Sequence, residues 1–269
     1  KISDLDSIAK RWFNTTDEDH PGVKYFKSRG DYIISGDVFR LRRDSVETPY
    51  VLTPTQIRSI LRDLNMATVV GFHTRNVLHR GHEFIQKKAL EMVKADGLLI
   101  SPVIGPKKKG DFAAKAILKS YERIISSGSY EPYKVLLGAF STYSRYSGPR
   151  EAVFTALCRK NFGCSHFIIG RDHTGVGNYY TADASQEIFT KVGDIGIKPV
   201  FFETAYYCNT CGYVTSGCQH LEKDRIKLSA TEIRKCLISN QKPPEYLLRT
   251  EISELLLSMM QANEQIFIS

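Results

Sequence analysis

Two polar motifs, each placed directly after a short run of apolar, β-prone residues, constrain the fold of this chain more than any other feature. The first spans residues 71–83 (G-F-H-T-R-N-V-L-H-R-G-H-E); it follows the run 67–70 and leads into a helix-like segment at 83–94. The second spans 170–177 (G-R-D-H-T-G-V-G) and follows the run 167–169. A strand that ends in such a loop and turns into a helix presents backbone N–H groups and a positive dipole end to an anion. The pair therefore predicts an open α/β sheet that binds nucleotide phosphates where its strands end.

The histidines of the first motif strengthen this interpretation. His79 and His82 are three residues apart, so they share one face of a first helical turn. Taken alone, an H-x-G-H tetrapeptide can arise by chance, and a G-R-D-H sequence can be a plain turn with a solvated arginine. Because the two motifs occur together and each ends a predicted strand, the sequence favours one phosphate site that they share.

The remaining elements alternate between strand and helix. Residues Thr53 to Gln56 combine a capping threonine, a proline in the first helical position and a glutamine three residues after the cap. Apolar residues then supply one helix face at Ile57, Ile60, Leu61 and Leu64. Further strands are expected at 98–104, 134–140, 165–169 and 199–204, and further helices at 114–126, 149–161, 182–191, after Ser229 and at 245–262. This alternation predicts a Rossmann-like parallel sheet with right-handed crossovers.

The length of 269 residues suits one large α/β domain with a small appendage. We expect the end of a preceding domain and a linker at 1–45, the catalytic domain at 46–204, and a zinc knuckle with a helical subdomain at 205–269. No apolar run reaches the roughly 18 residues of a membrane span, and the first residues carry no export signal. We therefore expect a cytoplasmic protein without a membrane partner.

The net charge is +8, with basic clusters at Arg40, Arg42 and Arg43 and at Lys107 to Lys109. This excess is either a solvated basic surface or a positive funnel that attracts ATP and a divalent oxyanion. Basic and aromatic residues do not alternate in the way that single-strand stacking requires, so no nucleic-acid partner is expected.

A second constellation lies near the end of the chain, where three cysteines and a histidine are spaced C-x2-C-x6-C-x-H: Cys208, Cys211, Cys218 and His220. This spacing matches a tetrahedral Zn²⁺ site. A disulfide pair or free thiols are the alternatives; disulfides fit poorly because thiols in the cytosol stay reduced. Four protein ligands leave no open position, so the zinc is expected to be structural. The other cysteines are expected to be small core residues: Cys158, Cys164 and Cys236.

The two motifs resemble those of the ATP sulfurylase (sulfate adenylyltransferase) family, a member of the H-x-G-H nucleotidyltransferase group, whose usual forms are Q-T-R-N-x-x-H-R-x-H and G-R-D-H-A-G. Other blocks are similar too: a domain join at 19–23 and 35–38, a lysine loop at 105–111, an arginine helix at 148–152 and an I-S-G-T-x-x-R block at 228–234. The likeness runs from about residue 17 to the end, and some family members carry a similar zinc-binding insertion. The chain begins without Met, near the end of the family's N-terminal domain, so we expect a piece of a longer protein or a lineage without that domain.

The resemblance implies a reversible transfer of AMP from ATP to sulfate, which gives adenylyl sulfate (APS) and pyrophosphate. Mg²⁺ would accompany ATP and pyrophosphate, and the expected assembly is a homo-oligomer. The matching catalytic residues are Thr74, Arg75, Asn76, His79 and His82, and the residues that match the sulfate pocket are His73, Arg75 and Thr174. The nucleotide would contact His73, the five catalytic residues, Gly170, Arg171 as a charge, Asp172 as an orienting group, His173 and the backbone of Leu228.

By this resemblance Arg75 holds the sulfate and Asn76 the ATP phosphates, while His79 and His82 stabilise the α–β bridge and the departing pyrophosphate. A sulfate oxygen is a weak nucleophile that must approach an anionic α-phosphate, so the site works by positioning and charge neutralisation. Three further basic residues are either charges behind the site or residues of helix surfaces: Lys108, Arg150 and Arg234.

Three positions depart from the family pattern: His73 replaces a glutamine, Thr174 an alanine and Ala230 a glycine. The first two lie where the family contacts sulfate. The imidazole of His73 can donate a hydrogen bond or carry a charge near neutral pH; a charge would make acceptor affinity weaken as the pH rises. The alternatives are therefore a nucleotidyltransferase of the same fold that acts on another oxyanion or a phosphonate, and a non-enzymatic zinc-knuckle interaction module.

Overall fold

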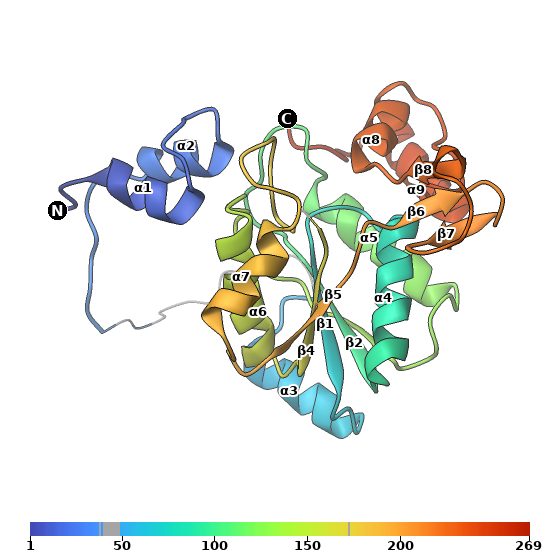
Figure 1. Cartoon of the computed structure of the whole chain (residues 1–269), viewed down its shortest axis with the longest axis horizontal. Coiled ribbons are helices and arrows are strands. Elements are labelled where there is room, and N and C mark those ends of the chain that lie inside the picture. Colours follow the sequence, from blue (N-terminus) through green and yellow to red (C-terminus); the bar gives the residue numbers. More distant parts are fainter. Residues whose placement is uncertain (38, 40–48, 172) are drawn as a thin grey trace.

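A five-stranded parallel sheet forms the centre of the molecule (Figure 1). The computed structural model describes residues 1–37, 39, 49–171 and 173–269. The strands lie in the order β3-β2-β1-β4-β5, and their bounds are β1 Val69–Thr74, β2 Gly97–Pro102, β3 Val135–Leu137, β4 His166–Ile169 and β5 Lys198–Phe201. The chain reverses its direction of winding between β1 and β4, and ligands of such sheets bind at the carboxyl ends of the strands at this point. The predicted Rossmann-like α/β fold is confirmed.

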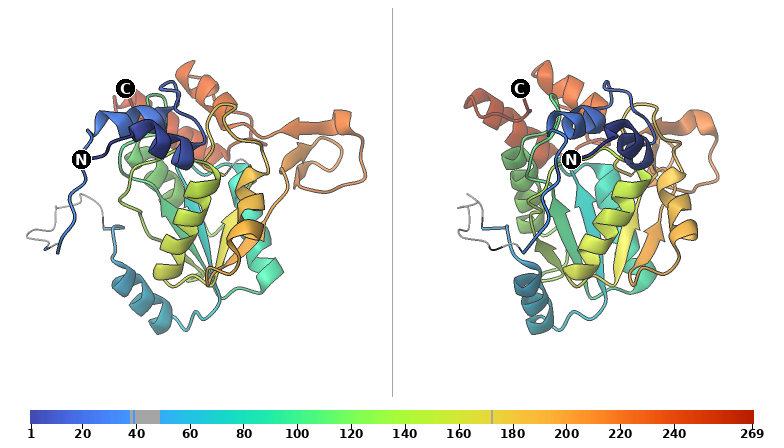
Figure 2. Two further views of the ribbon diagram at one scale, coloured as in Figure 1. Left: turned by 60° about the vertical axis from the view of Figure 1, so that its left-hand side comes forward. Right: turned by 90° about the vertical axis from the view of Figure 1, so that its left-hand side faces the viewer.

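Helices cover both faces of the sheet, as the two rotated views also show (Figure 2). Successive strand residues point to opposite faces, so Val70 packs with α4 and α5, whereas Val69 packs with α3, α6 and α7. The helix bounds are α3 Pro54–Asp63, α4 Arg80–Val93, α5 Ala114–Ser126, α6 Pro149–Asn161 and α7 Ala184–Val192. No helix in the described ranges is long and apolar enough to cross a membrane.

The predicted loop of the first motif is partly wrong, because β1 continues through its first four residues. The strand begins at Val69 and ends at Thr74, and His73 and Thr74 pair with Ser101 and Pro102 of β2. Both faces of β1 are covered, so the parallel ladder extends past the apolar run into polar residues. His73 and Thr74 are therefore buried side chains of a strand.

The predicted helix starts agree well with the structure. The Thr53 side chain accepts a hydrogen bond from the Gln56 N–H and the Gln56 side chain accepts one from the Thr53 N–H, which confirms the capping box of α3. Ile57 and Leu61 are buried as predicted, but Leu64 caps the end of the helix and is exposed. The bounds predicted for α5 and α6 match, and the other predicted elements differ by a few residues at their ends.

A helical pair that the sequence analysis did not predict precedes the sheet (Figure 1). It consists of α1 Leu5–Phe13 and α2 Pro21–Ser28, and Phe13 and Val23 form a small apolar cluster between them. His20 caps α2, and its Nε2 lies 3.0 Å from the Tyr146 carbonyl oxygen, which joins the pair to the loop before α6. The predicted boundary at 45/46 and the basic cluster at 40–43 lie outside the described residues.

A second, antiparallel sheet of three short strands follows β5, and Figure 2 shows it projecting from the body. Its strands are β6 Tyr206–Cys208, β7 Tyr213–Thr215 and β8 Arg225–Lys227, with the 3-10 turn η1 Glu222–Asp224 before β8; the helices α8 Ala230–Ile238 and α9 Thr250–Gln261 follow. The helix α8 begins directly after Ser229, as predicted, and the Ser229 side chain caps it. Leu237 of α8 and Leu256 of α9 belong to the same apolar cluster as α4 and α5, so the last helices complete one face of the main core.

A buried carboxylate ties α9 to α4. Glu83 is 5% exposed, and both of its oxygens accept hydrogen bonds from the Arg249 guanidinium, at 2.7 and 2.9 Å. Lys87 donates a third at 2.7 Å. Burial by itself raises the pKa of Glu83, but the bonds from Arg249 and Lys87 outweigh it and lower the pKa to about 2. This pair fixes the helix whose first turn carries the two motif histidines.

Candidate active site

Both sequence motifs line one cavity of about 270 Å³ at the carboxyl ends of β1 and β4. The structure brings together every described residue that the sequence analysis assigned to nucleotide and acceptor: His73, Thr74, Arg75, Asn76, His79, His82, Gly170, Arg171, His173, Thr174 and Leu228. Asp172 lies outside the described residues. The described lining does not include Lys107 to Lys109 or Arg150.

The two motif histidines stack at the start of α4. His79 caps the helix, and its Nδ1 accepts the His82 N–H at 3.3 Å, while the two rings stack at 3.7 Å between centroids. Burial and then the charge of Arg234 lower the pKa of His79 to about 4, and burial with the neighbouring His79 and His173 holds the pKa of His82 well below its usual range. The free protein therefore holds neutral imidazoles, and His79 keeps its ring proton on Nε2, available to an anion.

The backbone of this helix start contributes less than the sequence suggested. The Arg80 N–H donates to the Leu247 carbonyl oxygen at 3.0 Å, and the His82 N–H is used by His79. An anion here would meet the positive end of the α4 dipole and the side chains of the motif more than a row of free N–H groups.

The guanidinium of Arg75 is held from three sides. Its Nη2 donates to the Gly175 carbonyl oxygen at 2.7 Å, it lies 4.9 Å from the centre of the Tyr146 ring, and its Nε is 3.9 Å from Asp111 Oδ2. Its Nε is buried without a hydrogen-bond partner among the described residues. Arg75 also lines the cavity, so the part of its guanidinium that these contacts leave open can bind an oxyanion.

Arg234 reaches this network from α8. Its Nη2 donates to Asn76 Oδ1 at 2.7 Å and lies 3.5 Å from Asp111 Oδ1. Of the three basic residues whose place the sequence left open, Arg234 thus contacts the site, whereas Lys108 and Arg150 are exposed. Sequence reasoning missed Asp111 and Tyr146, because no local pattern marks a buried carboxylate and a ring whose partners are distant in the chain.

His73 is buried, and its Nδ1 has no hydrogen-bond partner in the described structure. Burial, and then the charges of Arg159, His173, Arg75 and Arg145, hold the pKa of His73 well below its usual range. Of the two options that the sequence left open, the structure thus favours a neutral imidazole that offers a hydrogen bond.

The hydroxyl group that Thr174 adds, where the family has an alanine, is bonded within the protein. The Thr174 hydroxyl lies 3.1 Å from the Gly148 carbonyl oxygen and 2.7 Å from the His173 carbonyl oxygen, both of which can accept its proton. The side chain therefore adds no free donor to the cavity. His173 contributes a ring whose Nε2 is buried without a partner, and burial together with Arg75 lowers its pKa to about 4.

Arg171 lies at the mouth of the cavity and is exposed. Its Nε is 2.8 Å from Asp183 Oδ1, and its Nη1 donates to Thr204 Oγ1 at 3.3 Å. The charge that the sequence assigned to the nucleotide is thus shared with a carboxylate at the start of α7.

Two buried ionisable residues of α6 were not predicted. Glu151 accepts the backbone N–H groups of Arg145 and Ser147, and burial raises its pKa. Arg159 is fully buried, lies 4.3 Å from the centre of the Phe140 ring, and has no hydrogen-bond partner for Nε or Nη2 among the described residues. The charge of Arg159 adds positive potential near His73 and helps to lower the pKa of that imidazole.

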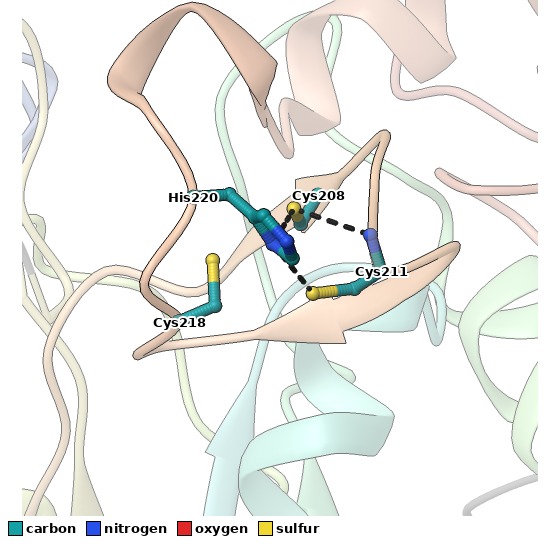
Figure 3. Close-up of side chains that lie close together, drawn as sticks. All are labelled: Cys208, Cys211, Cys218 and His220. Carbon is teal, nitrogen blue, oxygen red and sulfur yellow. Dashed lines mark hydrogen bonds between the residues drawn. The ribbon is translucent and has the colours of Figure 1, made fainter.

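The four predicted metal ligands converge in the small second sheet, as Figure 3 shows. Their ligand atoms all lie within 4.8 Å of one another, and His220 Nδ1 is 3.5 Å from Cys208 Sγ and 3.3 Å from Cys211 Sγ; Cys218 completes the set. The cysteines are free thiols in the structure. The cluster can hold a metal ion. Of the other cysteines, only Cys164 is fully buried, so the prediction that all three are core residues holds for one of them.

The sheet is parallel, and two stacked histidines and two arginines, Arg75 and Arg171, line a cavity at its switch point. These features define an α/β nucleotide-binding protein of the H-x-G-H type. The ATP-sulfurylase family model matches residues 48–259, so the chain belongs to the ATP-sulfurylase family.

Two relatives illustrate the membership. The chain is 43% identical over 265 residues to the sulfate adenylyltransferase of Halothermothrix orenii, covering 96% of this chain and 68% of the relative. It is 42% identical over 257 residues to the sulfate adenylyltransferase of Pyrococcus abyssi, covering 94% of this chain and 67% of the relative. Among solved structures, a hexameric APS kinase from Thiobacillus denitrificans matches with a TM-score of 0.62 and 17% identity over 83% of this chain and 42% of that one, which shows the fold.

Proposed function

We propose that this chain is a sulfate adenylyltransferase, which transfers AMP from ATP to sulfate and releases APS and pyrophosphate, in a reversible reaction. One observation carries the proposal: the two motifs, about a hundred residues apart in the sequence, line a single cavity at the switch point of the sheet. Family membership and relatives of this name agree with it.

The chemistry asks for positioning and for neutralisation of charge. In the proposal Arg75 holds the sulfate through its guanidinium, and Asn76 and Thr74 orient the phosphates at the end of β1. His79 and His82 act at the α–β bridge of ATP. As neutral imidazoles at a helix N-terminus they can donate hydrogen bonds to the pyrophosphate oxygens as negative charge develops there.

The second motif and Leu228 form the proposed nucleotide side. Gly170, Arg171 and His173 line the cavity on the β4 side, and Leu228 lines it next to Gly81. Asp172 remains part of the proposal by resemblance only. Mg²⁺ would arrive with ATP or pyrophosphate.

The hydrogen-bonding groups at the two altered positions, His73 and Thr174, favour sulfate over another acceptor. The neutral His73 can donate one hydrogen bond, as the glutamine of relatives can, and the Thr174 hydroxyl is directed to backbone carbonyl oxygens. Neither change supplies a new free charge or donor to the acceptor pocket. Another oxyanion or a phosphonate is therefore the second candidate.

We propose Zn²⁺ as the ion of the Cys208, Cys211, Cys218 and His220 cluster. Three thiolates and one imidazole are the ligands of a closed, tetrahedral zinc site, and all four positions would be filled by protein. The ion would join the end of β6, the turn before β7 and the loop after β7, and would support structure rather than reaction. A homo-oligomer and the division at 1–45, 46–204 and 205–269 also remain proposals; light scattering and limited proteolysis test them.

The test is release of pyrophosphate from ATP and Mg²⁺ by the purified chain, with sulfate, molybdate and a panel of phosphonates as acceptors. Sulfate adenylyltransfer predicts release with sulfate and molybdate, and APS as the product with sulfate. Release with a phosphonate alone supports the second candidate. No release with any acceptor, from folded protein, argues for a binding module.

A further inference from the structure

We infer that Asp111 is a positioning residue of the active site: its buried carboxylate holds Arg75 and Arg234, and through Arg234 also Asn76, in the arrangement that adenylyl transfer needs. This inference rests on the proposed function and deepens it. Asp111 is 1% exposed, and the described residues that line the cavity do not include it, so it acts through other side chains.

The geometry places one carboxylate between two arginines from distant parts of the chain. Asp111 Oδ2 lies 3.9 Å from Arg75 Nε, and Asp111 Oδ1 lies 3.5 Å from Arg234 Nη2. The same Nη2 donates to Asn76 Oδ1 at 2.7 Å. Two guanidinium groups in a half-buried site repel one another, and an anion between them removes much of that cost.

Tyr146 links the carboxylate to Arg75 by a second route. Its hydroxyl donates to Asp111 Oδ2 at 2.9 Å and accepts the Lys108 N–H at 2.7 Å. Its ring then lies under the Arg75 guanidinium, at 4.9 Å from the ring centre. Asp111 therefore fixes both the charge beside Arg75 and the aromatic face below it.

Backbone hydrogen bonds hold the segment that carries Asp111 in place. The Asp111 carbonyl oxygen accepts the Ile268 N–H at 2.8 Å, and the neighbouring Gly110 N–H donates to the Ile268 carbonyl oxygen at 2.9 Å. Phe112 pairs with Phe267 in an antiparallel bridge. The end of the chain thus pins the loop that carries Asp111, and a carboxylate with little freedom can set the angle of two long side chains.

The experiment compares Asp111→Asn with Asp96→Asn. Both changes remove the charge of a carboxylate that accepts hydrogen bonds, and both should lower the melting temperature, but Asp96 accepts the Ala67 and Thr68 N–H groups directly before β1 and lies outside the cavity. For Asp111→Asn we expect kcat to fall about 10- to 100-fold, because a small displacement of positioning groups has that effect. The KM for ATP should change less than kcat, because the second motif and Leu228 form the nucleotide side of the cavity. Asp96→Asn should keep both constants within about twofold.

Equal kcat values for Asp111→Asn and Asp96→Asn overturn the inference, as does a loss of kcat that disappears when rates are divided by the amount of folded protein. Should Asp111→Asn fail to fold, Tyr146→Phe takes its place, because it keeps every charge and the ring. A fall in kcat of about threefold or more at unchanged KM then supports the inference, and wild-type kcat overturns it.

A measurement that needs no turnover separates failure of the proposed function from failure of the positioning role. In crystal structures, the guanidinium groups of Arg75 and Arg234 should flank residue 111 in the wild type and in Asp96→Asn, and should be displaced in Asp111→Asn. A wild type that releases no pyrophosphate but shows this pattern refutes the proposed function alone. Unchanged guanidinium positions in Asp111→Asn refute the positioning role alone.

Discussion

Glu83 supports a prediction whose size follows from the structure. Its carboxylate is 5% exposed and binds Arg249 through both oxygens and Lys87 through one. Glu83→Gln keeps the shape of the side chain and removes its charge, which leaves the Arg249 guanidinium without its main partner. The variant should be less stable than the wild type because the bonds of a charged acceptor are lost.

The magnitude comes from the pKa, which the two cations lower from 4.5 to about 2. A displacement of this size corresponds to about 3 kcal/mol, at about 1.4 kcal/mol per pH unit. Arg249 and Lys87 are partly exposed, at 26% and 41%, so screening by water reduces the effect. We expect a loss of about 2 kcal/mol in the free energy of unfolding, or about 5 °C in Tm for a chain of this size.

The dependence on pH gives the prediction its sign. Because the pKa of Glu83 is lower in the folded chain, the stabilisation is fully present above about pH 4.5 and is lost as the pH falls toward about 2. Urea unfolding of wild type and Glu83→Gln between pH 7 and pH 2.5 measures the difference, in which shared effects of acid cancel. A difference that stays constant over this range, or a variant as stable as the wild type at pH 7, would refute the reasoning.

Three further predictions concern the site and the metal cluster. His79→Ala and His82→Ala should each lower kcat for pyrophosphate release by about 100-fold with little change in ATP affinity, because the imidazoles act on charge that develops in the transition state. Calorimetry that shows lost ATP binding in a variant with intact kcat would contradict this role. The KM for sulfate should be flat between pH 6 and 9 in wild type and in His73→Gln, since the lowered pKa keeps His73 neutral there; a KM that rises with pH in the wild type alone would restore a charged imidazole. The purified chain should carry about one Zn²⁺, and Cys211→Ser should lower Tm more than kcat; protein that contains no zinc when prepared without chelators excludes the site.

Local signals explain what could be predicted of the fold. The helix expected at 149–161 matches α6, whose first residue is a proline, and the capping box at Thr53 marks the start of α3. The strand–loop–helix motifs located the switch point, because they encode an anion site within a dozen residues. The metal cluster was visible for the same reason, since its spacing is set by one short segment.

The misses share a dependence on distant contacts. His73 and Thr74 are polar, and only the ladder with β2 and the helices on both faces make them strand residues. The strands β6, β7 and β8 have three residues each, too few to show a period of two. The helix α1 did carry a signal, an aspartate cap before an apolar face, that the sequence analysis passed over.

The site shows the same limit more sharply. Asp111 acts on Arg75 and Arg234, which lie far from it in the sequence, and no pattern in one chain marks such a hub. The protonation state of His73 is another example. Burial and Arg159 lower the pKa of His73, and nothing in the sequence distinguishes Arg159 from an ordinary basic residue in the last turn of a helix.

The central claim is tested most directly by the reverse reaction, the formation of ATP from APS and pyrophosphate. The wild-type chain with Mg²⁺ should form one ATP and one sulfate for each APS consumed, and Arg75→Met should lose at least about 100-fold in rate while staying folded. Folded wild-type protein that forms no ATP from APS, or an Arg75→Met variant as fast as the wild type, would contradict the account.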